Sequence, residues 1–214
     1  MMLNLLFPKK CILCRNILEK DETDLCHNCR INAPEFSSAK NNIPFVAGWT
    51  AVWYYRDNVK NSIHRYKFRN ARGYAAPYGR LLAIRIQQMQ TEFDYITWVP
   101  VSFRRRYRRG YDQVELLAKS VSKELGIPIC ATLKKVRHTP AQSGLRDASQ
   151  RKANVLGAYS VLPSCNISGK TVLLLDDVIT TGATTSECAK VLQASGAEKI
   201  YCAAIASAHN NKHR

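Results

Sequence analysis

Residues 171–185 read TVLLLDDVITTGATT. The apolar run from Val172 to Leu175 has no polar alternation, which predicts a strand that is buried on both faces of a sheet. Two acids follow it, and a turn of small and hydroxyl-bearing residues then leads into a helix expected over Thr184–Ala194, which Gly196 ends. After a buried strand, such a turn brings backbone N–H groups and a helix N-terminus to one place, where they suit a phosphate.

The rest of the chain alternates between the same two kinds of segment. The patterns predict strands over Phe45–Tyr55, Tyr95–Val101, part of Ile127–Val136, Thr171–Asp176 and Ile200–Ala206, and helices over Asn58–Phe68, Ala75–Met89 and Asp112–Leu125. Apolar strands that alternate with helices predict an α/β fold, in which helices cover both faces of a parallel sheet. Ligands bind at the carboxyl ends of the strands in such sheets, which is where residues 176–185 are expected.

The side chains of this loop point to a phosphorylated sugar. The hydroxyls of its threonines can add hydrogen bonds to a phosphate, whereas Asp176 and Asp177 cannot bind one. Paired carboxylates suit ribose hydroxyls, or Mg²⁺ reached directly or through water. An ordinary strand, turn and helix capped by Thr184 is the alternative that the residues alone leave open.

Four of the eight cysteines form a metal-binding pattern near the N-terminus. Cys11, Cys14, Cys26 and Cys29 have the spacing C-x2-C-x11-C-x2-C, which predicts a closed structural zinc site of four thiolates. His27 is an alternative ligand, and iron is an alternative metal. Disulfides within this group would need an oxidising compartment. Cys130, Cys165, Cys188 and Cys202 lie among apolar residues and are expected to be buried small side chains.

A polar, proline-marked stretch follows the fourth cysteine of this group, and it predicts a domain boundary near residue 44. Residues 1–44 would form the zinc-binding module and its linker, and residues 45–214 the α/β domain. No apolar run approaches the roughly 18 residues of a membrane span. The first residues also lack the features of a signal peptide, so a cytoplasmic protein is expected.

The chain is strongly basic, with 32 Lys and Arg against 16 Asp and Glu among 214 residues, for a net charge of +16. Between Arg56 and Arg109, 13 basic residues face 3 acidic ones, a local excess of 13 − 3 = +10. Clustered charge favours a polyanionic partner, either nucleic acid or a phosphorylated ligand. The alternative is that the charge only keeps the protein soluble.

Val172–Thr185 closely resembles the ribose-phosphate loop of type I phosphoribosyltransferases, and it is not a Walker A loop. The resemblance implies a phosphoribosyltransferase-like sheet with flanking helices. It also implies that the 5-phosphate of phosphoribosyl pyrophosphate is held by Thr180, Thr181, Gly182, Ala183 and Thr184. Asp176 and Asp177 would then contact the ribose hydroxyls.

A second stretch resembles the basic segment of the ComF family of competence-associated proteins. It begins with Val99-Pro100-Val101-Ser102 and, after Phe103, continues with Arg104-Arg105-Arg106-Tyr107-Arg108-Arg109-Gly110-Tyr111-Asp112-Gln113. The resemblance covers nearly the whole chain, the cysteine knuckles included. It implies that Pro100, Val101, Ser102 and Arg104 lie near the pyrophosphate. The family often has Asn where Asp112 stands, and an acid is slightly unfavourable there. Arg137, Gln142, Leu145, Arg151 and Asn154 would belong to a mobile excursion over the site.

Two hypotheses follow from these resemblances. In the first, the chain is a phosphoribosyltransferase-like protein that binds phosphoribosyl pyrophosphate with Mg²⁺ and is linked to DNA uptake, with Asp176, Asp177 and Arg104 carrying the chemistry. In the second, it is a non-enzymatic single-stranded DNA-binding accessory protein that retains the phosphoribosyl site and works beside a helicase-like partner. Arg105, Arg106, Tyr107, Arg108 and Arg109 would contact the DNA. His64, Arg65, Lys67 and Arg69 either extend this basic face or form a solvated helix side.

Overall fold

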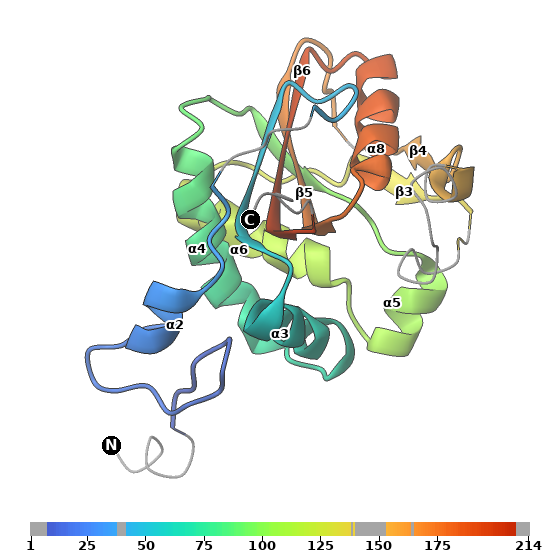
Figure 1. The fold of residues 1–214 in the computed structure, drawn as a ribbon. Coiled ribbons are helices and arrows are strands. Elements are labelled where there is room, and N and C mark those ends of the chain that lie inside the picture. The colour runs from blue at the N-terminus through green and yellow to red at the C-terminus, as the bar shows by residue number, and fades with distance from the viewer. Residues whose placement is uncertain (1–7, 38–41, 138, 140–152, 164, 209–214) are drawn as a thin grey trace.

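A computed structural model of the chain describes residues 8–37, 42–137, 139, 153–163 and 165–208 (Figure 1). Its centre is a four-stranded sheet in the order β1-β6-β5-β2, in which every neighbouring pair is parallel. The strands are β1 (Gly48–Tyr54), β2 (Tyr95–Trp98), β5 (Thr171–Ile179) and β6 (Lys199–Ser207). The predicted α/β class and parallel sheet are therefore confirmed.

Helices cover both faces of this sheet. The longer ones are α3 (Asp57–Phe68), α4 (Ala75–Gln87), α6 (Gln113–Leu125) and α8 (Ala183–Ala194), and the shorter ones are α2 (His27–Asn32), α5 (Phe103–Arg109) and the 3₁₀ helix η1 (Arg72–Tyr74). An antiparallel ribbon of β3 (Leu133–Lys135) and β4 (Tyr159–Val161) lies beside α8 (Figure 1). Within the described ranges, no helix is long and apolar enough to cross a membrane.

The two acids lie inside a strand, which corrects the prediction that the loop begins at Asp176. β5 continues to Ile179 because Val178 and Ile179 still pair with β6. Neighbouring side chains in a strand point to opposite faces. Leu173 and Leu175 pack in the core with α4 and α6, while Val172 and Leu174 pack against α8. By the same alternation, Asp177 faces the side of α4 and α6, and Asp176 faces the side of α8.

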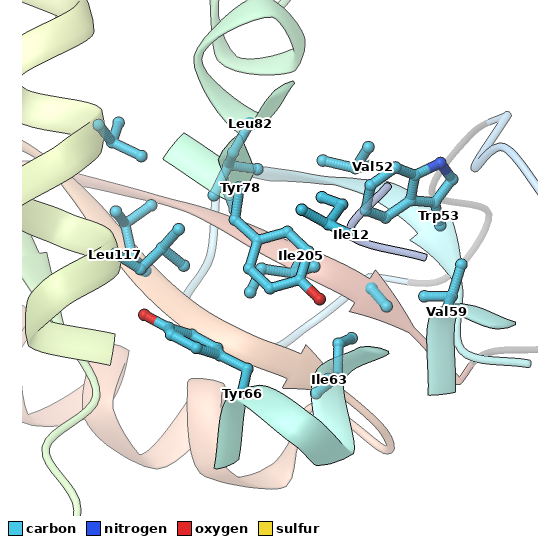
Figure 2. Close-up of a cluster of buried hydrophobic side chains, with 14 of the residues drawn as sticks. Ile12, Val52, Trp53, Val59, Ile63, Tyr66, Tyr78, Leu82, Leu117 and Ile205 are labelled. Atoms are coloured by element: carbon cyan, nitrogen blue, oxygen red, sulfur yellow. The ribbon is translucent and has the colours of Figure 1, made fainter. Parts of the chain in front are cut away.

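The cysteine module shares the main core of the molecule. Ile12, Leu13 and Leu25 are buried in one cluster with Trp53 and Tyr78. Figure 2 shows Ile12 next to Val52 and Trp53. At the edge of this contact, Arg80 of α4 donates two hydrogen bonds to the Asp24 carboxylate, at 2.8 and 2.5 Å. The module therefore packs as part of the fold.

Two sequence expectations differ from the structure or fall outside the described residues. The expectation of buried side chains holds for Cys130, Cys188 and Cys202, whereas Cys165 is half-buried. Cys130 and Cys165 form a disulfide, which the sequence did not predict. Pairing between cysteines 35 residues apart is a tertiary property that spacing does not reveal. Gln142, Leu145 and Arg151 of the expected excursion lie outside the described residues.

Gly79 allows α4 and α6 to pack closely. A Cβ at Gly79 would lie 2.5 Å from Ser120 Cβ and 3.1 Å from the Ser120 carbonyl carbon, so Gly79→Ala must push the helices apart. We expect the free energy of unfolding, measured with urea, to fall by about 2 kcal/mol. The control is Gly73→Ala, where nothing lies within 4 Å and the change should stay within about 0.5 kcal/mol. Equal stability of the two variants would contradict this account.

Candidate ligand site and metal centre

The four N-terminal cysteines converge on one point. Their sulfur atoms all lie within 4.8 Å of one another, and Cys14 Sγ is 3.6 Å from Cys26 Sγ. Four sulfurs about 2.3 Å from a tetrahedral zinc ion would be separated by about 3.8 Å, so the donor set fits zinc. His27 is exposed and does not belong to this group, which leaves four thiolates as the ligands among the described residues.

The turn between β5 and α8 is tightly packed and carries one buried hydroxyl that is unpaired among the described residues. Gly182 has φ +74° and caps α8, and a Cβ there would meet Ile43 at 3.0 Å, so the position requires glycine. Thr181 Oγ1 is buried and has no hydrogen-bond partner in the described part of the chain. Buried hydroxyls in folded proteins are nearly always paired. An oxygen-rich ligand at the N-terminus of α8 would supply the missing partner.

A second loop, after β2, is held in place by Asp112. One carboxylate oxygen accepts from Val101 N–H at 3.0 Å, and the other accepts from Val114 and Glu115 N–H at 2.9 and 3.2 Å, so it also caps α6. Burial raises the pKa of Asp112, and these N–H groups act against that shift. Ser102 Oγ in the same loop is buried without a partner among the described residues. The carboxylate thus serves backbone groups, which explains why an acid is tolerated here.

Asp176 faces a cationic environment on the α8 side of the sheet. Lys135 Nζ of β3 donates to the Tyr159 hydroxyl at 3.1 Å, and burial together with repulsion from Arg105 lowers the pKa of Lys135 to about 8. Burial and the charge of Asp177 raise the pKa of Asp176. Arg105 is anchored by a hydrogen bond from its guanidinium to the Thr139 carbonyl at 3.0 Å. A negatively charged ligand would be attracted by Lys135 and Arg105 at this side.

Asp177 instead binds other side chains of the protein, on the α4 and α6 side of the sheet. Its Oδ1 lies 2.7 Å from Lys67 Nζ of α3, and its Oδ2 accepts from Gln113 Nε2 of α6 at 2.7 Å. The Gln113 side-chain oxygen in turn accepts from Arg109 at 2.7 Å. The side chain of Asp177 is 8% exposed and that of Lys67 is 20% exposed. Asp177 is thus the centre of a buried polar network.

The arginines of α5 divide between two sides of the helix. Arg105 and Arg109 are half-buried, and the Arg109 guanidinium lies 4.7 Å from the centre of the Phe68 ring. Arg104, Arg106 and Arg108 are exposed, and Arg106 pairs with Glu115 at 3.4 Å. Phe103 and Tyr107, one helical turn apart, are 82% and 83% exposed. Exposed aromatic rings that are flanked by arginines are unusual on a protein surface.

The structure therefore brings some of the predicted site residues to the candidate site and leaves others away from it. The residues Thr180–Thr184 lie where β5 gives way to α8, and Pro100–Ser102 lie in the loop after β2. Arg104 is exposed, while Arg105, assigned to nucleic acid, is anchored inward. Sequence reasoning missed Lys135, Tyr159 and Gln113 as groups of the site, and it placed Lys67 on a surface. Their contacts join segments far apart in the chain, and no local pattern signals them.

Comparisons with known proteins agree with this architecture. A family model described as a phosphoribosyl transferase domain matches residues 115–214, and one described as a double zinc ribbon domain matches residues 2–39. Competence protein F of Haemophilus influenzae is 30% identical over 226 residues, which cover 94% of this chain and 98% of that protein. DNA utilization protein YhgH of Salmonella typhi is 34% identical over 148 residues, which cover 64% of this chain and 62% of that protein.

The solved structures that match part of the chain include two enzymes of phosphoribosyl chemistry. A glutamine phosphoribosylpyrophosphate amidotransferase from B. subtilis is 21% identical with a TM-score of 0.44, and the match covers 65% of this chain and 30% of that one. A purine phosphoribosyltransferase from Pyrococcus horikoshii is 20% identical with a TM-score of 0.36, covering 62% and 72%. Given its match over nearly the full length of competence protein F, the chain belongs to the ComF family, in which a zinc ribbon precedes a phosphoribosyltransferase domain.

Proposed function

We propose that this chain binds phosphoribosyl pyrophosphate together with Mg²⁺ at the carboxyl ends of β5 and β2. The observation that carries the proposal is the buried hydroxyl of Thr181, which has no partner among the described residues and lies beside the left-handed Gly182 at the start of α8. The 5-phosphate would complete the hydrogen bonding of this turn, with the backbone N–H groups of α8 as further donors. The membership of a family with a phosphoribosyltransferase domain supports the same ligand.

The remaining groups of the ligand have matching side chains nearby. Asp176 would accept hydrogen bonds from the ribose hydroxyls, and Lys135 and Arg105 would face the pyrophosphate together with the loop that holds Ser102. Asp177 is engaged by Lys67 and Gln113, so Asp176 is the carboxylate left for ribose or Mg²⁺. Mg²⁺ in such sites is bound by one or two carboxylates, ligand phosphates and waters, which a single protein carboxylate can satisfy.

These residues suit the departure of pyrophosphate from C1 of the ribose. As an acceptor nucleophile bonds to C1 and the C1–O bond breaks, negative charge grows on the leaving pyrophosphate oxygen, and fixed cations such as Arg105 would stabilise it. Mg²⁺, when bound, would neutralise the same charge. Asp176 and the phosphate turn would hold the sugar in one orientation through the reaction.

Thr181→Val tests the phosphate turn, because it removes the hydroxyl and keeps the shape of the side chain. We expect the affinity for phosphoribosyl pyrophosphate and Mg²⁺, measured by calorimetry, to fall by about tenfold, since one hydrogen bond contributes about 1–1.5 kcal/mol. Ser160→Ala is the control, because it removes another buried hydroxyl without a partner among the described residues, outside the turn. If Thr181→Val bound the ligand with native affinity, the placement of the 5-phosphate would be wrong.

A second function, binding of single-stranded DNA, is favoured by the exposed face of α5. Phe103 and Tyr107 can stack on bases, and Arg104 and Arg108 beside them can contact phosphates. Relatives named competence protein F and DNA utilization protein YhgH support a role in DNA handling. The sequence of the chain contains no motif that resembles a recognition helix or finger for reading bases, so sequence-tolerant binding is expected.

Paired variants of α5 separate stacking from phosphate contact. Phe103→Ala with Tyr107→Ala should weaken binding of an oligothymidylate by at least about tenfold and leave the salt dependence unchanged. Arg104→Ala with Arg108→Ala should instead reduce the slope of log affinity against log salt by about 1.4, or 0.7 for each phosphate contact. Ile84→Ala, an exposed apolar residue of α4, is the control. Native affinity and slope in both α5 variants would contradict DNA binding at this face.

A further inference from the structure

Helix α3 contacts the zinc module through its middle turns. Ser62 Oγ donates a hydrogen bond to the Ile12 carbonyl at 2.5 Å, and the Arg65 guanidinium donates to the Ile12 and Leu13 carbonyls at 2.9 and 2.7 Å. These two carbonyls lie between Cys11 and Cys14, in the turn whose shape depends on both sulfurs reaching one metal ion. Arg65 and Ser62 therefore contact the backbone of a zinc knuckle directly.

The last turn of the same helix contacts the ligand site. The Tyr66 hydroxyl donates to the Gln113 carbonyl at 2.6 Å, and Lys67 Nζ lies 2.7 Å from Asp177 Oδ1. Gln113 binds the other oxygen of Asp177. Figure 2 shows Tyr66 and Ile63 of α3 in the same buried cluster as Ile12 and Tyr78. Residues 65 and 67 are thus neighbours on one helix that serve two different sites.

The packing of α3 against the core leaves the helix no room to move on its own. Val59, Ile63 and Tyr66 are fully buried, so α3 cannot rotate without disturbing the core. A helix end moves with the rest of the helix, and packed interiors transmit displacement. If the Ile12 and Leu13 carbonyls moved away, the half-buried Arg65 guanidinium would be left with unpaired N–H donors. This cost favours repositioning of the helix.

We propose that Arg65 and Lys67 are positioning residues that join the zinc knuckle to the phosphoribosyl site through α3. The closed knuckle fixes Arg65, Arg65 fixes the register of α3, and Lys67 then holds Asp177 so that the adjacent Asp176 and the turn at Gly182 keep their geometry. The part of this inference that concerns ligand affinity rests on the proposed function. The mechanical link itself does not, because it joins protein groups only.

Arg65→Met tests the link, since it removes the guanidinium and keeps an apolar stem of similar length. Arg80→Met is the matched control, because Arg80 also binds the zinc module, through Asp24, but lies on α4 rather than α3. Three quantities are measured in zinc-loaded full-length protein: zinc content, amide hydrogen exchange in residues 176–182, and affinity for phosphoribosyl pyrophosphate with Mg²⁺. Arg65→Lys, which keeps the charge but cannot span two carbonyls in the same way, serves as the milder variant.

We expect Arg65→Met to retain zinc, to speed exchange in residues 176–182 by at least about tenfold and to weaken ligand binding by about tenfold. Arg65→Lys should recover part of both effects, and Arg80→Met should change neither by more than about twofold. Native exchange in residues 176–182 of a folded, zinc-loaded Arg65→Met variant, or in Arg65→Lys if the first variant fails to fold, would overturn the link. If the native protein bound no phosphoribosyl pyrophosphate, the proposed function would fail and the exchange rates alone would decide on the link.

Discussion

Replacing Cys26 and Cys29 with serine is expected to lower the Tm of the whole chain by about 20–40 °C, in a single transition. Structural zinc sites contribute about 10 kcal/mol to the folding of small modules, and this module shares its core with the α/β domain. Ile12, Leu13 and Leu25 pack in one cluster with Trp53 and Tyr78. Because these residues cannot leave without exposing the domain core, metal loss should destabilise both parts together.

Differential scanning calorimetry of the double variant measures this effect. Cys188→Ala is the control, because it removes a buried thiol that is not near the metal and should cost about 1 kcal/mol. A calorimetric trace with two separate transitions, the larger one at the native Tm, would show that the zinc module folds and melts on its own. That outcome would contradict the shared core.

Asp176→Asn is expected to abolish or strongly weaken phosphoribosyl pyrophosphate binding while preserving the fold. Hydrogen bonds to a charged group contribute about 1.5–3 kcal/mol each, so loss of the carboxylate should reduce affinity by about 10- to 100-fold or more. Burial and Asp177 raise the pKa of Asp176 to about 8, so folding at neutral pH costs free energy, because the unfolded chain has this group ionised. The neutral amide removes that cost, and Tm at pH 7 should be equal to or higher than that of the native protein.

The pH dependence of stability gives an independent check on this residue. A group whose pKa is raised in the folded state binds protons on folding, so its contribution improves as the pH falls. The stability advantage of Asp176→Asn should therefore shrink between pH 7 and pH 5. Asp177→Asn is the contrasting variant, since it breaks a buried pair with Lys67 and should lower Tm instead. Equal Tm changes in the two variants would contradict the different roles assigned to the acids.

The elements that the sequence predicted best are those with strong local patterns. The apolar run Val172–Leu175 identified the central strand, and the cysteine spacing identified four sulfurs that the structure brings within 4.8 Å. α5 was missed because all seven of its residues are arginines or aromatics, which give no apolar stripe for a helix. The disulfide was missed because pairing depends on the tertiary arrangement of distant segments.

The roles of the two acids could not be read from the sequence for a geometric reason. Whether adjacent carboxylates point to one site depends on where the strand ends, and β5 ends only after Val178 and Ile179 have paired with β6. A strand ending at Asp176 would have allowed both acids into one loop. Similarly, Arg65 and Lys67 looked like surface cations of an amphipathic helix. Their partners, the knuckle carbonyls and Asp177, are more than 50 residues away in the chain.

The most direct test of the account is a calorimetric titration of zinc-loaded native protein with phosphoribosyl pyrophosphate and Mg²⁺, alongside Asp176→Asn. We expect saturable binding by the native protein, and loss of that binding in the Asp176→Asn variant with an undiminished Tm. An absence of binding heat at several temperatures, from native protein that is folded and zinc-loaded, would contradict the central claim that β5 and α8 build a phosphoribosyl pyrophosphate site.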